Sequence, residues 1–195
     1  RLEERKLLEF KSRTGTYEFR NNIGVDVELA IADTVKKNYH KVDICGTLGS
    51  ILKDKYILPK KHNQMYCMTR YFNFKVMSFR QYMNMSSTAY LEWNNHPDGV
   101  IVLLLPSSDL DVAAVADHTA KLADPCLVVC LPHPIEPCDE QVRYLLAVRS
   151  LLKDIKFLEG NKAVKKELEG LEEDTIHELN KWVQKAYFPL GQVFG

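Results

Sequence analysis

Two uninterrupted apolar runs in the second half of the chain are the clearest pattern. Residues 100–105 read VIVLLL and residues 126–131 read CLVVCL, and prolines follow both runs. An apolar run of strand length bounded by such stops is typical of a strand buried on both faces of a parallel sheet. We therefore expect two buried strands here.

Helical patterns follow each of these runs. Residues 107–111 supply N-cap side chains and early acids for a helix that extends to about Ala123. A second helix is expected over about 137–153, with Pro137 near its first turn. Strand, helix, strand, helix with short connections predicts parallel βαβ units.

A long amphipathic helix is expected from about 161 to 187. Its apolar residues recur at helical spacing, interrupted only by Gly170: Val164, Leu168, Leu171, Leu179, Trp182 and Ala186.

The first half has shorter and more mixed signals. Residues 1–11 form a charged, helix-favouring run. The alternation of apolar and polar residues predicts strands at 16–20 and 72–77, and helices are expected at 26–40, 47–53 and 78–85.

The predicted class is α/β, with a mostly parallel sheet, βαβ units in the C-terminal half, a helix-rich N-terminal part and a long C-terminal helix. We expect a single domain over 1–195, divided into a mixed part (1–95), a βαβα core (96–160) and the long helix (161–187).

Composition narrows the class of protein. The 195 residues are 46% hydrophobic and 27% charged, with a formal net charge of zero, which is typical of a globular domain. No apolar run reaches the roughly 18 residues that a membrane helix needs, so we expect no membrane partner. The chain starts at Arg1 inside a charged run and ends in an apolar tail at 188–195. We read both ends as cuts inside a longer protein, whose other domains would be partners of this one.

The five cysteines allow two interpretations. Cys126, Cys130 and Cys138, with His133 nearby, have spacing that suggests zinc. However, the first two lie on a predicted strand and not on a turn. We therefore favour structural thiols in a reducing, cytoplasmic setting, with no metal.

Catalytic motifs are missing from the sequence. No P-loop and no Gly-x-Gly-x-x-Gly is present, and Lys53 falls too late after Gly46 and Gly49 for a P-loop lysine. Ser107 and Ser108 have no nucleophile elbow around them. We predict no catalytic residue and no cofactor in this chain, and whether it belongs to an enzyme stays open.

Polar residues that follow the two buried strands offer one candidate site. In open α/β sheets, ligands bind at the carboxyl ends of the strands. Ser107, Ser108, Asp109 and His133 would line that edge if the two strands are neighbours. This gives one functional alternative, a small-ligand or nucleotide-sensing domain.

A charge asymmetry gives the other candidate site. Residues 55–91 contain no Asp or Glu but many basic and aromatic residues. Cations neutralise phosphates and aromatic rings stack on bases, so this composition suits nucleic acid or an acidic partner. The candidate contact residues are Lys55, Lys60, Lys61, Arg70, Tyr71, Lys75 and Arg80. Alternatively, the aromatics pack inward and the segment balances the acidic residues at 167–178.

Several segments resemble an internal region of very large bacterial P-loop ATPases, the ATPase subunits of bacteriophage-exclusion (BREX) systems and their relatives. The segments are FRNNIGVD at 19–26, YILPKKHN at 56–63, TRYF at 69–72, DGVIVLLLP at 98–106 and AVRSLLKD at 147–154. The resemblance implies an AAA-type ATPase module elsewhere in the parent protein, which would use ATP and Mg²⁺, with DNA and other phage-defence proteins as partners. No catalytic residue of the family is carried over. The leading interpretation is a non-catalytic auxiliary or scaffold domain of a DNA-associated ATPase.

Overall fold

The computed structural model describes residues 8–11, 16–19, 26–38, 42–87, 97–159 and 161–188. Its packing divides the chain into two compact units. One comprises Arg1–Val42 and Cys138–Leu179, and the other comprises Asp43–Pro137 and Asn180–Gly195. Each unit is therefore assembled from two separated stretches of chain.

The second unit contains a four-stranded sheet in the order β3-β4-β5-β6. Its strands are β3 (Tyr56–Ile57), β4 (Phe72–Met77), β5 (Gly99–Leu104) and β6 (Leu127–Cys130). β4, β5 and β6 are parallel, and β3 is antiparallel to β4. The predicted α/β class with a mostly parallel sheet is confirmed, and a further βαβ unit precedes the one that joins β5 to β6, because α4 (Phe79–Met83) connects β4 to β5.

The two apolar runs differ in burial. All six residues of β5 are buried, as expected of a strand with a neighbour on each side. The expectation of burial on both faces is wrong for β6, where the Val128 side chain is 44% exposed. β6 lies at the edge of the sheet in the described part of the chain. An apolar run signals a strand but does not show whether a second strand will flank it.

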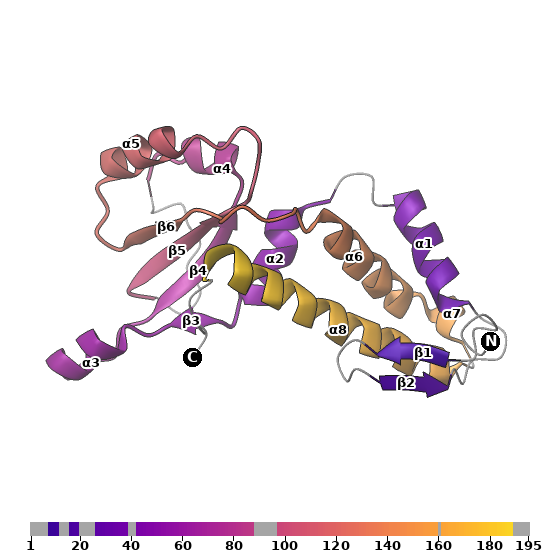
Figure 1. Ribbon diagram of the computed structural model, residues 1–195. Coiled ribbons are helices and arrows are strands. Elements are labelled where there is room, and N and C mark those ends of the chain that lie inside the picture. The colour runs from indigo at the N-terminus through magenta and orange to yellow at the C-terminus, as the bar shows by residue number, and fades with distance from the viewer. Residues whose placement is uncertain are drawn as a thin grey trace. The chain divides into compact units, whose positions relative to one another are not determined.

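One face of this sheet is covered by α4 and α5 (Val112–Leu122), as Figure 1 shows. Tyr82, Met85 and Val115 pack there against alternate residues of β5 and against β6. Both helices start at side-chain caps. Ser78 and Gln81 form a capping box before α4, and Asp111 accepts from two backbone N–H groups of α5.

The end of α8 (Lys162–Tyr187) packs on the opposite face. The Tyr187 hydroxyl donates to the Leu104 carbonyl at 2.7 Å, and the rings of Phe74 and Phe188 lie 6.1 Å apart. Side chains alternate between the two faces of a strand, and Phe74 lies between β4 residues whose side chains face α4. Phe74 and its neighbour Phe188 therefore lie on the opposite face of the sheet.

The helix α2 (Ile44–Leu52) also packs against β4. It begins three residues earlier than the predicted 47–53, because the Asp43 carboxylate accepts from the Gly46 N–H at 2.9 Å and starts the helix there.

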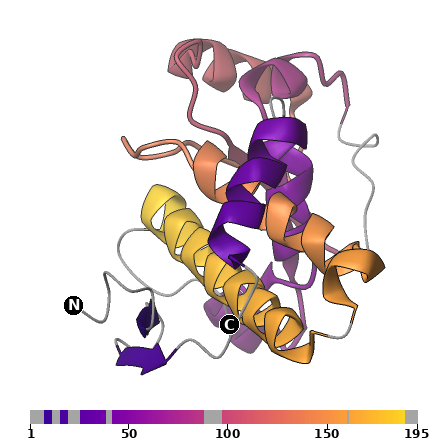
Figure 2. The ribbon, with the colours of Figure 1, turned by 90° about the vertical axis from the view of Figure 1, so that its right-hand side faces the viewer.

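The first unit contains a hairpin and a helical bundle (Figure 2). β1 (Leu8–Lys11) pairs antiparallel with β2 (Thr16–Phe19), so the helix-favouring composition of residues 1–11 does not produce a helix at residues 8–11. Helix propensity is a local preference, and the ladder of hydrogen bonds to β2 is a non-local gain that outweighs it. Residues 1–7 and Arg20 lie outside the described part of the chain.

The predicted helices of this unit are present. They are α1 (Val27–Asn38), α6 (Asp139–Lys153) and the first part of α8, and the short α7 (Ile155–Leu158) was not expected from the sequence. Val27 and Ile31 of α1 share a core with apolar residues of the others, namely Ala147, Val148, Leu151, Val164 and Leu168. An ion pair of 2.7 Å between Arg149 and Glu172 joins α6 to α8. No helix in the described part of the chain is both long enough and apolar enough to cross a bilayer.

Candidate contact surface on the β3–α3–β4 hairpin

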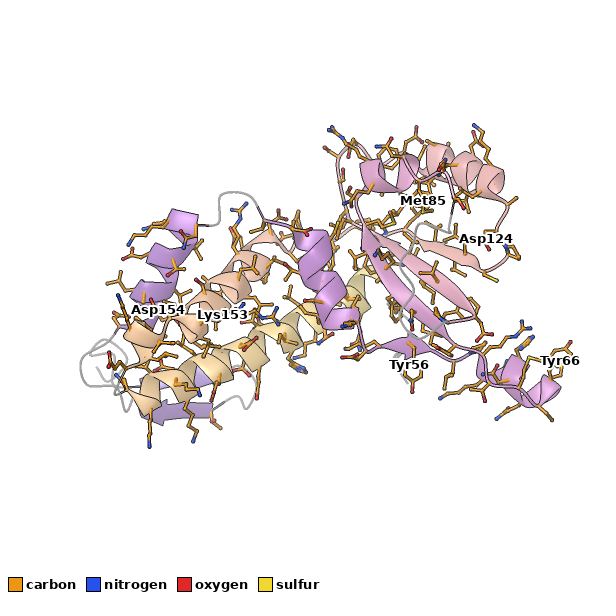
Figure 3. The ribbon with its side chains drawn as sticks, turned by 180° about the vertical axis from the view of Figure 1, so that it is seen from behind. Tyr56, Tyr66, Met85, Asp124, Lys153 and Asp154 are labelled. Atoms are coloured by element: carbon orange, nitrogen blue, oxygen red, sulfur yellow. The ribbon has the colours of Figure 1, made fainter. Side chains whose placement is uncertain are left out.

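An exposed helix, α3 (Lys60–Tyr66), connects β3 to β4, and we call β3, α3 and β4 together the β3–α3–β4 hairpin. α3 has no buried residue, and it extends beyond the end of the strands (Figure 1). Met65 is 73% exposed and Tyr66 is 57% exposed, and Figure 3 shows Tyr66 at the outer end of the helix. Single exposed apolar side chains are common on protein surfaces, so the charge of this segment has to be considered with them.

Asn63 holds the hairpin in shape. Its side-chain amide donates to the Arg70 carbonyl at 2.9 Å, and its side-chain oxygen accepts from the Arg70 N–H at 3.1 Å. The backbone carbonyl of Asn63 accepts from the N–H of Cys67, which ends α3 in the left-handed region with φ of 48°. These contacts return the chain from α3 to β4 without a hydrophobic core. Sequence patterns did not reveal β3 or α3, and the only local signal for the return is this asparagine.

Lys60 and Lys61 are exposed in the first turn of α3. Within the described residues, neither lysine has an ion-pair partner. The first turn is the positive end of the helix dipole, where a cation costs about 0.3–1 kcal/mol. Helix stability therefore does not explain two lysines at these positions.

The arginines of the predicted set face acids. The Arg70 guanidinium lies 4.0 Å from the Asp98 carboxylate, which also accepts from the Tyr71 N–H. The Arg80 guanidinium lies 3.1 Å from Asp109. Arg70 precedes β4 and Arg80 follows it, so a full strand of about 20 Å separates the two.

Lys55 is only partly accessible. Its ammonium group donates to the side-chain oxygen of Asn180 at 2.6 Å, and burial lowers the pKa of Lys55 below its usual range. The seven predicted contact residues thus do not form one continuous band. Lys60 and Lys61 lie in α3, and Arg70 and Tyr71 lie just before β4, whereas Lys75 lies within β4, Arg80 follows β4 and Lys55 contacts Asn180.

An open hollow lies beside β3 and β4, with a volume of about 420 Å³. Two tyrosines line it, Tyr56 and Tyr71, whose ring centroids lie 6.0 Å apart at an interplanar angle of 72°. Tyr56 is the cross-strand partner of Asn73, which also lines the hollow. We call this feature the tyrosine hollow. The contact residues predicted from the sequence include Tyr71 but not Tyr56 or Asn73, because the proximity of these residues depends on the β3–β4 register.

A second open hollow, of about 520 Å³, lies between β4 and α4. Lys75, Gln81 and Asn84 line it. Since side chains alternate along a strand, Lys75 and Asn73 lie on the same face of β4, roughly 7 Å apart. Lys75 therefore lies between the two hollows.

The four strand-end residues lie at one edge of the sheet. Ser107, Ser108 and Asp109 follow β5, and His133 follows β6, which is parallel to it. The Ser107 hydroxyl donates to the Asp109 carboxylate, which also pairs with Arg80, and the His133 N–H donates to the Ala186 carbonyl. Neither hollow is lined by any of the four. Ligand crevices in such sheets form where the strand order reverses, whereas the described strands β4, β5 and β6 follow one another without reversal.

The cysteines are all free thiols in different environments. Cys67 and Cys126 are exposed, whereas Cys138 is 2% exposed, and burial together with the neighbouring Asp139 raises its pKa to about 12. No cluster of three or more His, Cys, Asp or Glu side chains that could hold a metal ion occurs among the described residues.

Comparisons with protein-family models, with curated proteins and with solved structures find no match to this chain.

Proposed function

We propose that this chain is a non-catalytic contact domain that binds nucleic acid through the β3–α3–β4 hairpin. The observation that carries the proposal is the pair Lys60 and Lys61, exposed and without an acidic partner among the described residues. Lysine side chains attract phosphates whatever the base sequence is. Binding is driven by the release of counterions that were condensed on the nucleic acid.

The surroundings of the two lysines support this choice of ligand. Tyr66 is exposed on the same helix, and Asp98 pairs with Arg70 and not with the two lysines. The segment from 55 to 91 has no acidic residue of its own. A polyanion approaching α3 therefore meets Lys60, Lys61 and an aromatic ring, whereas the neighbouring acids Asp54 and Asp98 lie outside α3.

The alternative is a small-ligand or nucleotide-sensing domain at the strand ends. Its support is the placement of Ser107, Ser108, Asp109 and His133 at one sheet edge. Because Asp109 already binds Ser107 and Arg80, a ligand there would have to compete with those contacts. The hairpin lysines face no such competition, so we favour the nucleic-acid surface.

For the biological setting, we propose a larger DNA-associated P-loop ATPase of phage defence, acting in the cytoplasm. The support is the resemblance of the five segments described above, two of which, at 56–63 and 69–72, form most of the hairpin. The test is the coding sequence that flanks this chain, where a Gly-x-x-x-x-Gly-Lys-Ser/Thr motif is expected. A complete flanking sequence without that motif would refute the ATPase setting and would leave the hairpin proposal intact.

The hairpin proposal is tested by fluorescence anisotropy with a labelled oligonucleotide over a range of salt concentrations. The double variant Lys60→Ala/Lys61→Ala should bind roughly tenfold more weakly. The slope of its log binding constant against log salt concentration should become shallower by about one to two phosphate contacts. Its thermal midpoint should not fall, because both cations oppose the α3 dipole.

The matched control is Lys36→Ala/Lys37→Ala, which removes two adjacent exposed lysines from the last turn of α1. This variant should bind like the unmodified chain. The proposal is wrong if the unmodified chain shows no salt-dependent binding, or if both double variants weaken binding equally.

A further inference from the structure

The tyrosine hollow adds a feature that electrostatics alone does not require. It lies at the base of the hairpin, where α3 begins with Lys60 and Lys61, and its lining includes aromatic and amide side chains. We propose that this hollow receives one unpaired nucleobase, so that the hairpin binds single-stranded in preference to double-stranded nucleic acid. This inference rests on the proposed function.

The size and lining of the hollow suit a base. Its volume of about 420 Å³ falls within the range of small-molecule sites, and it opens to the surface. Tyr56 is 43% exposed, so part of its ring is accessible (Figure 3). A base that stacks on this ring buries apolar area for both partners, and stacking tolerates any base because every base has a π-face.

The edge-to-face arrangement of the two tyrosines leaves room for such a stack. With an interplanar angle of 72°, the edge of one ring meets the face of the other, and the second face of that ring is not used by the pair. A face-to-face pair would instead have covered one face of each ring.

Polar groups around the rings match the remaining parts of a nucleotide. Asn73 and Thr69 line the hollow and offer donors and acceptors to the edge of a base. Lys53 lines its rim as an exposed cation for a phosphate, and Lys75 is the next residue on the same face of β4. The one acid that lines the hollow, Asp54, would repel phosphates but can accept from an exocyclic amino group.

A duplex cannot use this hollow without disruption. Its bases are stacked and paired, and extruding one costs several kcal/mol, whereas an unpaired strand offers its bases freely. The duplex would therefore contact only the cationic part of the hairpin. This difference separates a base-binding hollow from a purely electrostatic surface.

The experiment compares three ligands of about 20 nucleotides by anisotropy: oligothymidine, an abasic strand with the same phosphates, and a duplex. The unmodified chain should bind oligothymidine roughly 5- to 100-fold more tightly than the abasic strand. Tyr56→Ala should abolish that difference, whereas Tyr56→Phe should keep it, because the ring and not the hydroxyl stacks. Ile155→Ala, which truncates an 82% exposed apolar side chain of α7, is the surface control and should change nothing.

The two proposals fail in distinguishable ways. If the unmodified chain binds all three ligands equally, and Tyr56→Ala has no effect, the base-binding inference is wrong and the electrostatic function stands. If it binds none of them, the proposed function is wrong and the inference falls with it. Asp54→Asn adds a second readout, since it should tighten binding of both single strands by removing repulsion, and weaker binding of the abasic strand would contradict this placement of the phosphates.

Discussion

The Tyr82 hydroxyl and the Thr119 hydroxyl are 2.6 Å apart and join α4 to α5 on one face of the sheet. Tyr82 is fully buried, and its ring lies edge-on to His118 at 5.2 Å. Thr119 donates its own proton to the Val115 carbonyl at 2.7 Å, so Tyr82 is the donor in the shared bond. Two residues that are 37 positions apart thereby fix the two helices that cover one face of the sheet.

Tyr82→Phe should lower the free energy of unfolding by about 0.5–1.5 kcal/mol. The loss stays small because Thr119 keeps its bond to Val115 and the ring still fills the core. Tyr82→Ala should cost about 3–5 kcal/mol, since it leaves a cavity. Urea unfolding monitored by circular dichroism measures the stability of both variants. Equal losses of stability would contradict the prediction that the ring contributes more than the hydroxyl.

The same hydroxyl predicts a pH dependence. Burial raises the pKa of Tyr82 above its ordinary value of 10.0. A group whose pKa is higher in the folded state contributes stability that is complete below its unfolded pKa and is lost as pH rises through the folded pKa. The stability advantage of the unmodified chain over Tyr82→Phe should therefore shrink above pH 10. If the difference in stability between the two chains stays constant above pH 10, folding does not raise the pKa of Tyr82.

The two glycines of α2 should respond differently to alanine. A Cβ at Gly49 would meet nothing within 4 Å, so Gly49→Ala should stabilise the chain by roughly 0.5–1 kcal/mol through helix propensity. A Cβ at Gly46 would collide with the Asp43 carboxylate that caps the helix. Moving that carboxylate sacrifices a cap that contributes about 1 kcal/mol.

Gly46→Ala should therefore be neutral or destabilising, and thermal unfolding of the two variants side by side provides the comparison. Gly46→Ala should lose its penalty in an Asp43→Ala background, where no cap remains to be displaced. A stabilisation by Gly46→Ala equal to that of Gly49→Ala would show that the Asp43 cap is not formed.

Elements with a strong local pattern were predictable from the sequence. In β5, α5 and α6, the pattern of apolar residues and the residues that end each element indicate the same boundaries. The 26-residue α8 is long enough for its helical periodicity to be recognised. β3 has only two residues and α3 buries none, so neither has a pattern to detect. The strand β1 depends on β2, a partner that local propensity does not include.

The candidate site was predictable in composition but not in arrangement. The absence of acids over 55–91 pointed to the hairpin, because charge is visible residue by residue. The position of Lys55 depends on Asn180, which lies 125 residues away. The tyrosine hollow depends on the pairing of Tyr56 with Asn73, and such a register is fixed only when the strands meet.

Gly99 is required where β5 passes between its neighbours. A Cβ there would collide with the Phe72 ring of β4 and would lie 2.5 Å from the Cys126 carbonyl oxygen, which accepts from the Val100 N–H. Gly99→Ala should therefore destabilise the chain by about 2–3 kcal/mol in denaturant unfolding. Phe72→Leu should rescue only part of this loss, since the carbonyl is backbone and cannot move without breaking a ladder bond. A complete rescue would show that the ring alone sets the requirement.

The thiols should differ in reactivity according to their exposure and charge state. The thiolate is the species that reacts, and Cys138 is buried before α6 with a pKa of about 12, so it is a neutral thiol at ordinary pH. Iodoacetamide at about pH 8 should therefore modify the exposed Cys67 and Cys126 first and Cys138 last, as measured by mass spectrometry of the digested protein. In denaturant all five should react at similar rates, because burial no longer separates them. Cys138 reacting as fast as Cys67 in the folded chain would contradict the burial of the α6 N-cap on which this order depends.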